Sequence, residues 1–319
     1  MSKVFTIGEI LVEIMANQKG QRFDQSGIWN GPYPSGAPAI FIDQVTRFGV
    51  SCGIISCVGK DGFGDININR LAADGVDIRG ISVLPLETTG SAFVTYHESG
   101  ERDFIFNIKN AACGKLSASH VDETLLKDCT HFHIMGSSLF SFHMVNAVKK
   151  AVMLVKQNGG VISFDPNIRK EMLDIPEMRD ALHFVLELTD IYMPSEGEVL
   201  LLSSHLTPER AIAGFLEDGV KEVIVKRGSK GASFWSATEQ FHVDSYPVQE
   251  IDPTGAGDCF GGAYIACRQL GYDARQALQY ANACGALAVT RRGPMEGTSM
   301  LAEITAFIER HQVLVQENS

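Results

Sequence analysis

Near the end of the chain, residues 252–258 read DPTGAGD and lead directly into an apolar, helix-like segment. Backbone amides without bulky side chains at a helix N-terminus form a hollow that binds an anion. An aspartate in such a hollow is electrostatically unfavourable unless it has a task, such as accepting a proton from an attacking hydroxyl. The stretch therefore predicts phosphoryl transfer to an alcohol, with Asp258 as the general base. The amides that hold the phosphoryl group would come from Gly255, Ala256 and Gly257.

The expected charge of Asp258 suits this role, and other interpretations of the stretch are less favoured. We expect the Asp258 carboxylate to have an ordinary pKa of about 3.9 and to be ionised at neutral pH. The alternative is a plain helix start, in which the aspartate favours the helix dipole and glycine eases the turn. A thiol nucleophile at Cys259 is disfavoured because no histidine lies near it in the sequence. The chain has no Gly-x-x-x-x-Gly-Lys-Ser/Thr string, and Phe260 stands where a dinucleotide-binding motif needs its third glycine.

The elements that must position these residues follow a repeating pattern. From about residue 130 onward, short apolar runs at 131–135, 161–164, 190–193 and 222–225 alternate with segments of helical periodicity. This alternation predicts an α/β fold whose mostly parallel sheet has helices on both faces. Ligands bind such sheets at the carboxyl ends of the strands. Polar residues directly after the predicted strands are Asp165, Asn167, Arg169, Glu198 and Lys226.

Two stretches depart from this pattern. Residues 18–35 are polar and rich in glycine and aromatics, and residues 91–106 alternate as two strands joined by a turn. Such a hairpin typically closes over a ligand or pairs with another subunit, although an edge hairpin without a binding role is the alternative. Because no linker or repeat is visible, we expect one domain over residues 1–319, with lid segments at about 12–35 and 88–110.

Composition narrows the class of partner. The formal net charge is -11, and no cluster of Lys and Arg is present, so nucleic acid is not an expected partner. The N-terminus has no leader-like segment, and no apolar run reaches membrane-spanning length, so we expect a cytoplasmic protein with no membrane partner. The seven cysteines are scattered without a Cys-x-x-Cys pair, which favours reduced, packed thiols over zinc or disulfides.

Motifs in a fixed order resemble the ribokinase-like (PfkB) carbohydrate kinase family, in the branch of fructokinases, tagatose kinases and 2-keto-3-deoxygluconate kinases. The resemblance covers nearly the whole chain. It implies a three-layer ribokinase-like α/β fold with a small β lid, and ATP-dependent phosphorylation of a sugar hydroxyl. The motifs are GEILVE at 8–13, SGAPA at 35–39, VGKDGFG at 58–64, DPNIR at 165–169, KRGSKGA at 226–232 and DPTGAGD at 252–258.

The resemblance also implies roles for single residues, with a sugar and ATP as ligands, Mg²⁺ as cofactor, and a homodimer formed through the lid. Glu198 is the candidate for Mg²⁺, held through water as that ion prefers, and Asp252 is the candidate for K⁺ or another monovalent cation. The sugar side comprises Glu13, Gly36, Ala37, Arg102, Phe106, Ile108, Arg169 and Asp258. The nucleotide side comprises Asn167, Ser195, Lys226, Gly228, Gly231, Gly255, Gly257 and Asn282.

Two positions depart from the family pattern. Ser195 replaces an asparagine that helps to organise magnesium, so we expect Glu198 to keep its role with altered water geometry; a solvated acid in the first turn of a helix is the alternative. Ile40 replaces an asparagine that meets sugar hydroxyls, so one polar contact is missing or comes from elsewhere.

The substrate prediction depends on the outer strand of the hairpin. Relatives that phosphorylate 2-keto-3-deoxygluconate have an arginine where this chain has Ile108, and an apolar residue cannot neutralise a buried carboxylate. This favours a neutral ketohexose such as fructose or tagatose. A sugar acid is the alternative, because Arg102 lies nearby and a shift of one residue would turn Lys109 inward. A sugar- or nucleotide-sensing protein without catalysis is the alternative from another class.

Overall fold

The computed structural model describes residues 3–99, 101–168 and 176–317. Within them, the main sheet has the strand order β13-β12-β11-β10-β9-β8-β1-β4-β5. Neighbours are parallel from β11 to β5, while β12 and β13 form an antiparallel edge, so the predicted mostly parallel α/β sheet is confirmed. The strands are β1 (Val4–Ile7), β4 (Cys52–Gly59), β5 (Ile81–Leu84), β8 (His131–Met135), β9 (Val161–Asp165), β10 (Ile191–Tyr192), β11 (Glu222–Lys226), β12 (Ala232–Ser236) and β13 (Gln240–Val243).

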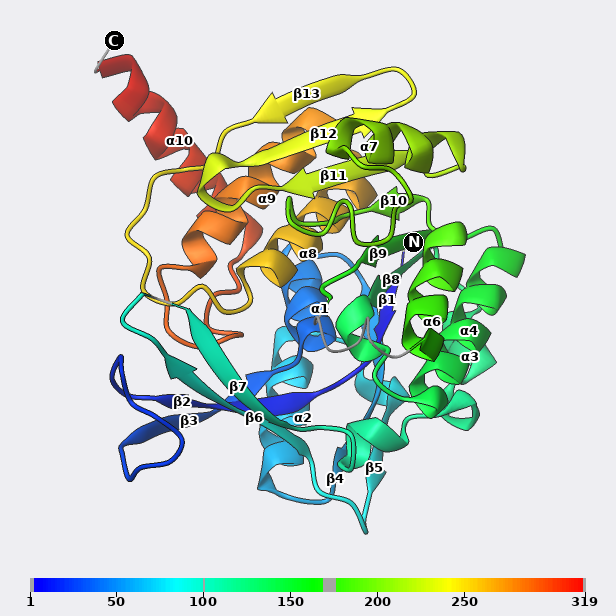
Figure 1. Cartoon of the computed structure of the whole chain (residues 1–319), viewed down its shortest axis with the longest axis vertical. Coiled ribbons are helices and arrows are strands. Elements are labelled where there is room, and N and C mark those ends of the chain that lie inside the picture. Colours follow the sequence, from blue (N-terminus) through cyan, green and yellow to red (C-terminus); the bar gives the residue numbers. More distant parts are fainter. Residues whose placement is uncertain (1–2, 100, 169–175, 318–319) are drawn as a thin grey trace.

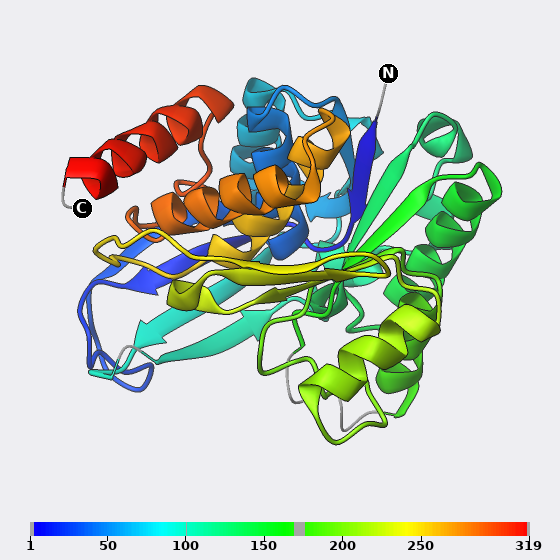
Figure 2. The same ribbon diagram turned by 90° about the horizontal axis from the view of Figure 1, so that it is seen from above.

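Helices cover both faces of this sheet, as Figure 2 shows from above. Each face has its own apolar core, because the helices present stripes of buried aliphatic and aromatic side chains to the strands. Among the described residues, no helix has both the length and the apolar character needed to cross a membrane. One face carries α1 (Ala37–Arg47), α2 (Gly62–Asp74), α8 (Ala256–Gln269), α9 (Ala274–Ala288) and α10 (Leu301–Glu317), and the other α3 (Glu123–Leu126), α4 (Phe142–Gln157), α6 (Pro176–Glu187) and α7 (Pro208–Glu217).

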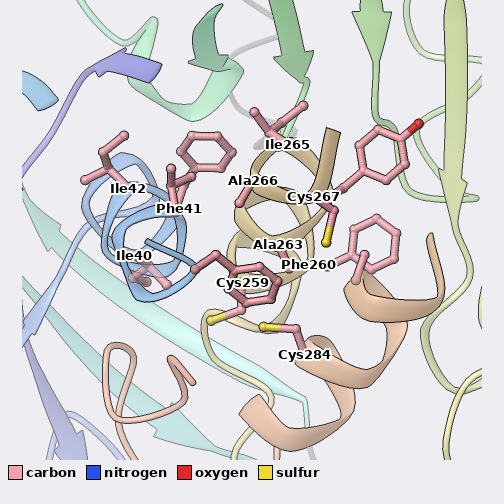
Figure 3. Packing of buried hydrophobic residues seen from close by; sticks show 14 of the residues in the cluster. Ile40, Phe41, Ile42, Cys259, Phe260, Ala263, Ile265, Ala266, Cys267 and Cys284 are labelled. Carbon is pink, nitrogen blue, oxygen red and sulfur yellow. The ribbon is translucent and has the colours of Figure 1, made fainter. Parts of the chain in front are cut away.

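Helix α8 is buried along most of its length, from Asp258 to Cys267. Figure 3 shows residues 40–42 of α1 on one side of it and Cys284 of α9 on the other. Small residues such as Gly261, Gly262 and Ala263 allow this close packing. The core therefore determines where the first turn of α8 points.

A small sheet projects from one side of the main sheet (Figure 1). Its strand order is β3-β2-β6-β7, and β6 pairs with β7 in the antiparallel register Tyr96↔Arg102, within the stretch for which the sequence predicts a hairpin. The ring of Trp29 stacks on that of Phe23, from the loop between β2 and β3, and meets the ring of Phe93 edge to face. The strands are β2 (Leu11–Ala16), β3 (Trp29–Ser35), β6 (Gly90–Tyr96) and β7 (Arg102–Asn107).

Candidate active site

A cavity of about 1000 Å³ is lined by the carboxyl ends of the main strands, the small sheet and the start of α8. Glu9 follows β1, Asp165 ends β9 and Lys226 ends β11, so these side chains meet at one edge of the sheet. This is the edge at which ligands bind in parallel α/β sheets. Segments that are far apart in the sequence thus contribute to a single site.

The glycine turn, defined as residues 252–258, forms one wall of this cavity. Gly255 adopts a left-handed conformation with φ 78°, and a Cβ atom there would lie 2.8 Å from the Pro294 carbonyl oxygen. Gly255, Gly257 and Asp258 line the cavity. A Cβ atom at Gly257 would lie 3.9 Å from Lys226 Nζ, so a cation faces the exposed amides. Bare amides opposite a lysine make an anion site.

Asp258 lies in the first turn of α8 and its side chain lines the cavity. Burial raises the pKa of Asp258 well above its usual range, and the neighbouring Asp165 carboxylate raises it further. The sequence-based expectation of an ordinary pKa is therefore wrong. The cause of the raised pKa, burial by segments that are distant in the sequence, is invisible in the local sequence. A carboxylate with a raised pKa accepts a proton from an alcohol more readily.

Asp165 and Lys226 form a buried ion pair on the floor of the cavity. Burial raises the pKa of Asp165 to about 6, although Lys226 acts in the opposite direction. Burial lowers the pKa of Lys226, but Asp165 and Glu198 outweigh this effect and raise it above the usual value. The lysine is therefore positively charged at neutral pH. Asn167, at φ 37°, donates its backbone N–H to Asp165 Oδ1 at 3.2 Å and also lines the cavity.

Glu198 is held by Ser195 at the cavity wall. Its Oε2 accepts hydrogen bonds from the Ser195 hydroxyl at 2.6 Å and the Ser195 amide at 2.8 Å, and its Oε1 accepts from the Ile168 amide at 2.8 Å. The alternative of a solvated acid in a helix is wrong, because this segment is a series of turns. Over residues 3–99, 101–168 and 176–317, no cluster of three or more His, Cys, Asp or Glu is placed to bind a metal directly. The donor set suits a hydrated hard cation.

A second cavity, of about 500 Å³, adjoins the first at the glycine turn. Gly257, Lys226, Gly228 and Pro253 line both cavities. Asp258 lines only the large one. The residues that line only the smaller one include Gly231, Ala256, Asn282 and the aromatic rings of Tyr246 and Phe260.

Asn282 contributes to this second cavity mainly by holding a loop. Its Nδ2 donates to the carbonyl oxygens of Val243 at 2.9 Å and Asp244 at 3.2 Å. The side chain therefore fixes the backbone just after β13, which leads to the cavity-lining residues 245–248. This is an indirect contribution that the sequence alone did not predict.

The expected sugar-side residues that the structure describes come together in the large cavity, with one exception. Glu13 Oε1 accepts from the Ser35 hydroxyl at 2.7 Å, and Gly36 and Ala37 follow at the start of α1. At Gly36, with φ 114°, a Cβ atom would lie 2.3 Å from the Glu9 carbonyl oxygen, so the close approach requires glycine. Arg102 and Phe106 reach the same cavity from β7, and Ile40 lines it from α1.

Ile108 is the exception. It lies just beyond β7 and packs against Leu11, Ala92 and Cys113 in a small apolar cluster, away from the large cavity. The expectation that Ile108 faces the substrate is therefore wrong, because the strand ends one residue earlier and the chain turns into the core. Arg169 lies outside the described residues.

Asp252 is almost completely buried and lines neither cavity. Its Oδ1 accepts from the Thr254 hydroxyl at 2.7 Å and the Thr254 amide at 3.1 Å, and its Oδ2 accepts from the Gly293 amide at 3.0 Å. Asp252 therefore joins the glycine turn to the loop that contains Gly293.

Glu9, Ser137 and Ser138 are site residues that sequence reasoning missed. Glu9 is buried, with its oxygens accepting from the hydroxyls of Ser138 at 2.5 Å and Ser137 at 3.3 Å. Glu9 and Ser137 line the large cavity. Ser137 and Ser138 lie two and three residues after the predicted strand at 131–135, so extending the signal that was used for Asp165 by a few residues would have found them. No strand was predicted before Glu9.

Cys259 does not contribute a nucleophile. Its thiol is buried beside that of Cys284, and in Figure 3 the two sulfur atoms point toward each other between α8 and α9. The neighbouring Cys284 and burial raise the pKa of Cys259 well above its usual range. A protonated, buried thiol is unreactive, so it serves as packing.

Comparison with known proteins defines the class. A model of the pfkB family of carbohydrate kinases matches residues 1–300, and the chain belongs to this family. It is similar to Probable fructokinase-5 of Arabidopsis thaliana, with 30% identity over 302 residues, which cover 91% of this chain and 92% of that protein.

Two crystal structures are similar to this chain over nearly their full lengths. One is an E. coli protein assigned provisionally as a ribokinase II, in complex with ATP and Mg²⁺, with 86% identity, a TM-score of 0.95, and coverage of 98% of this chain and 100% of that chain. The other is a fructokinase double mutant of Vibrio cholerae O395 with fructose, ADP and a potassium ion, with 28% identity, a TM-score of 0.83, and coverage of 97% and 98%.

Proposed function

We propose that the protein transfers the γ-phosphoryl group of ATP to a hydroxyl of a small neutral sugar, a ketohexose such as fructose or tagatose. One observation carries the proposal: two cavities meet at the bare amides of the glycine turn, and the acid Asp258 faces only the larger of them. A donor and an acceptor that occupy separate cavities can meet only where the cavities join. The base is then on the acceptor side, where the proton must be removed.

The two cavities differ in a way that assigns the substrates. The smaller one is bordered by the rings of Tyr246 and Phe260 and suits a purine, with the phosphates extending to Lys226 and Gly228. The larger one is lined by carboxylates and hydroxyls and suits a polyhydroxylated sugar. The ATP and Mg²⁺ bound by the E. coli relative and the fructose bound by the V. cholerae fructokinase support this assignment.

In the reaction, Asp258 accepts the proton of the sugar hydroxyl as that oxygen attacks the γ-phosphorus of ATP. The bond from this phosphorus to the β–γ bridging oxygen breaks, and ADP leaves. The amides of residues 255–257 donate hydrogen bonds to the transferring phosphoryl oxygens, and Lys226 supplies positive charge across from them. Bound Mg²⁺ would neutralise nucleotide charge, and Glu198 and Asp165 would hold its water ligands. Positioning and charge neutralisation are the main requirements of phosphoryl transfer, and these residues meet both.

The charge of the large cavity favours a neutral sugar over a sugar acid. Among the described residues, its cations are Arg102 and Lys226, and both are engaged, with Thr254 and Asp165 respectively. Among the described lining residues, a substrate carboxylate would face more carboxylates than cations, at a cost of several kcal/mol. The carboxylates of the lining are Glu9, Glu13, Asp103, Asp165, Glu198 and Asp258.

We also propose that residues 1–319 form one kinase domain whose lid is the small sheet, and that homodimers form through this lid. Ile28 and Ile105 are exposed on it and support an interface. We propose a cytoplasmic location, which the seven free, buried cysteines support. Asp252 is proposed to border a K⁺ site, and the K⁺ in the V. cholerae fructokinase supports that role.

An ADP-release assay over ketohexoses, pentoses and 2-keto sugar acids tests the function. We expect ADP from ATP only with a neutral ketohexose, and loss of turnover in Asp258→Asn while ATP still binds. The exposed Asp128→Asn is the matched control and should keep turnover. Faster turnover with a 2-keto sugar acid than with any ketohexose would refute the neutral-sugar proposal. Sugar binding by calorimetry without ADP formation for any sugar would favour a sensor instead.

A further inference from the structure

The small sheet and the glycine turn meet through one side-chain contact. Arg102, the first residue of β7, donates from Nη1 to the Thr254 hydroxyl at 2.9 Å, across 152 positions of sequence. Both side chains are partly or fully buried, so solvent competes weakly for this bond. A charged donor to a hydroxyl makes a stronger hydrogen bond than a neutral one.

The receiving hydroxyl is itself fixed. The Thr254 hydroxyl donates its single hydrogen to Asp252 Oδ1 at 2.7 Å, which leaves its lone pairs to accept from Arg102. The Tyr96 hydroxyl of β6 reaches the same Asp252 oxygen at 3.4 Å. Side chains from two strands of the small sheet therefore hydrogen-bond to one buried unit, the pair of Asp252 and Thr254.

This unit lies directly before the amides that hold the phosphoryl group. Thr254 precedes Gly255, where the left-handed backbone and the nearness of the Pro294 carbonyl and Ile40 to the position of a Cβ atom both require glycine. Because Thr254 is bonded directly to Gly255, its position helps to determine that of the turn that carries the amides of Ala256 and Gly257. A change in the position of the small sheet would therefore change the geometry of the anion site.

We propose that Arg102 is a positioning residue for phosphoryl transfer: by bonding Thr254, it sets the geometry of the glycine turn when the small sheet covers the sugar. The reaction to which this refers rests on the proposed function above. Arg102 acts here through Thr254 and not as a ligand of the sugar. The arrangement makes the anion site complete only when the sheet is seated, which limits ATP hydrolysis in the absence of a sugar.

Kinetics of Arg102→Ala, Thr254→Val and the double variant test the proposal. Loss of one charge-assisted bond in a phosphoryl-transfer site should lower kcat by about 10- to 100-fold, with the Kd of ATP changed by less than about threefold. In the Thr254→Val background, Arg102→Ala should lower kcat by less than about twofold, because the two side chains act as one unit. Arg102→Lys should recover part of kcat. Arg22→Ala, which removes an exposed arginine paired with Asp24 in the β2–β3 loop, is the matched control.

Two outcomes would overturn the proposal: additive losses in the double variant, or an increase in sugar KM without a change in kcat, which would make Arg102 a direct sugar ligand. Hydrogen exchange of the ligand-free protein provides a readout independent of activity. The Thr254 amide, which donates to Asp252, should exchange faster in Arg102→Ala than in wild type or Arg22→Ala. Unchanged exchange refutes the contact's positioning role. If wild type phosphorylates no sugar, the proposed function fails while the exchange result still decides this inference.

Discussion

Asp165→Asn should make the stability of the protein less dependent on pH. Burial raises the pKa of Asp165 from its ordinary value of 3.8 to about 6. Because the folded pKa is the higher one, the folded state holds a proton that the unfolded state has lost between these two pH values. Stability is therefore greatest below the unfolded pKa and falls as pH rises through the folded pKa.

The size of the effect follows from the shift. A rise of about two units in the pKa of Asp165 corresponds to about 3 kcal/mol in the free energy of unfolding. This amount is lost as the pH rises from below the unfolded pKa to above the folded pKa. Between about pH 4.5 and 7.5, where the protein can be assayed, the integrated change is about 2 kcal/mol. For a chain of 319 residues, this corresponds to about 3 °C in Tm.

The assay compares the thermal unfolding of Asp165→Asn and wild type, followed by circular dichroism at several pH values. The difference in Tm, variant minus wild type, should rise by about 3 °C from about pH 4.5 to 7.5. Any cost of the substitution that does not depend on pH cancels, because only the change of this difference with pH is compared. The exposed Asp128→Asn is the control.

A flat difference would mean that Asp165 remains ionised throughout and that burial does not raise its pKa. A difference that falls as pH rises would mean that the Lys226 partner dominates over burial. Neither result would affect the first cause of the raised pKa of Asp258, which is its own burial; an ionised Asp165 would raise that pKa further.

Three further predictions concern the glycine turn and its neighbours. Because the pKa of Asp258 is raised and only its ionised form accepts a proton, kcat/KM should decline on acidification at a higher pH than an ordinary aspartate would allow; a profile flat down to about pH 5 would contradict this. Gly255→Ala should lower Tm and kcat together, because a left-handed backbone costs an alanine about 1–2 kcal/mol and its Cβ would meet the Pro294 carbonyl; Gly271→Ala, also at positive φ but with open space around it, should lower Tm alone. Ser195→Ala should raise the Mg²⁺ concentration needed for half-maximal rate by about 10-fold through loss of the hydroxyl bond to Glu198; an unchanged Mg²⁺ dependence would exclude the role of that hydroxyl.

Local sequence predicted the parts of this site that depend on local geometry. The glycine turn, the strand ends at Asp165 and Lys226, and the hairpin of β6 and β7 each lie where the sequence indicated. These features depend on backbone propensity and periodicity, which a short stretch of sequence contains.

Features that depend on distant segments could not be predicted in this way. The raised pKa of Asp258 results from burial by segments that are far apart along the chain. Ile108 turns into the core because β7 ends at Asn107, and the alternation of faces holds only within a strand. Asn282 holds the loop after β13, a contact over 38 to 39 positions that no local pattern encodes.

The first turn of α8 also limits how such an enzyme can be re-engineered. Ala256 borders one cavity and Asp258 the other, so two residues of a single helical turn serve two different chambers. Insertion or deletion of a residue here would rotate the following side chains by about 100° about the helix axis. It would therefore change which residue faces which cavity. Redesign toward new acceptors should therefore leave the length of this segment untouched and vary the rim instead, at Ile40 or Phe140.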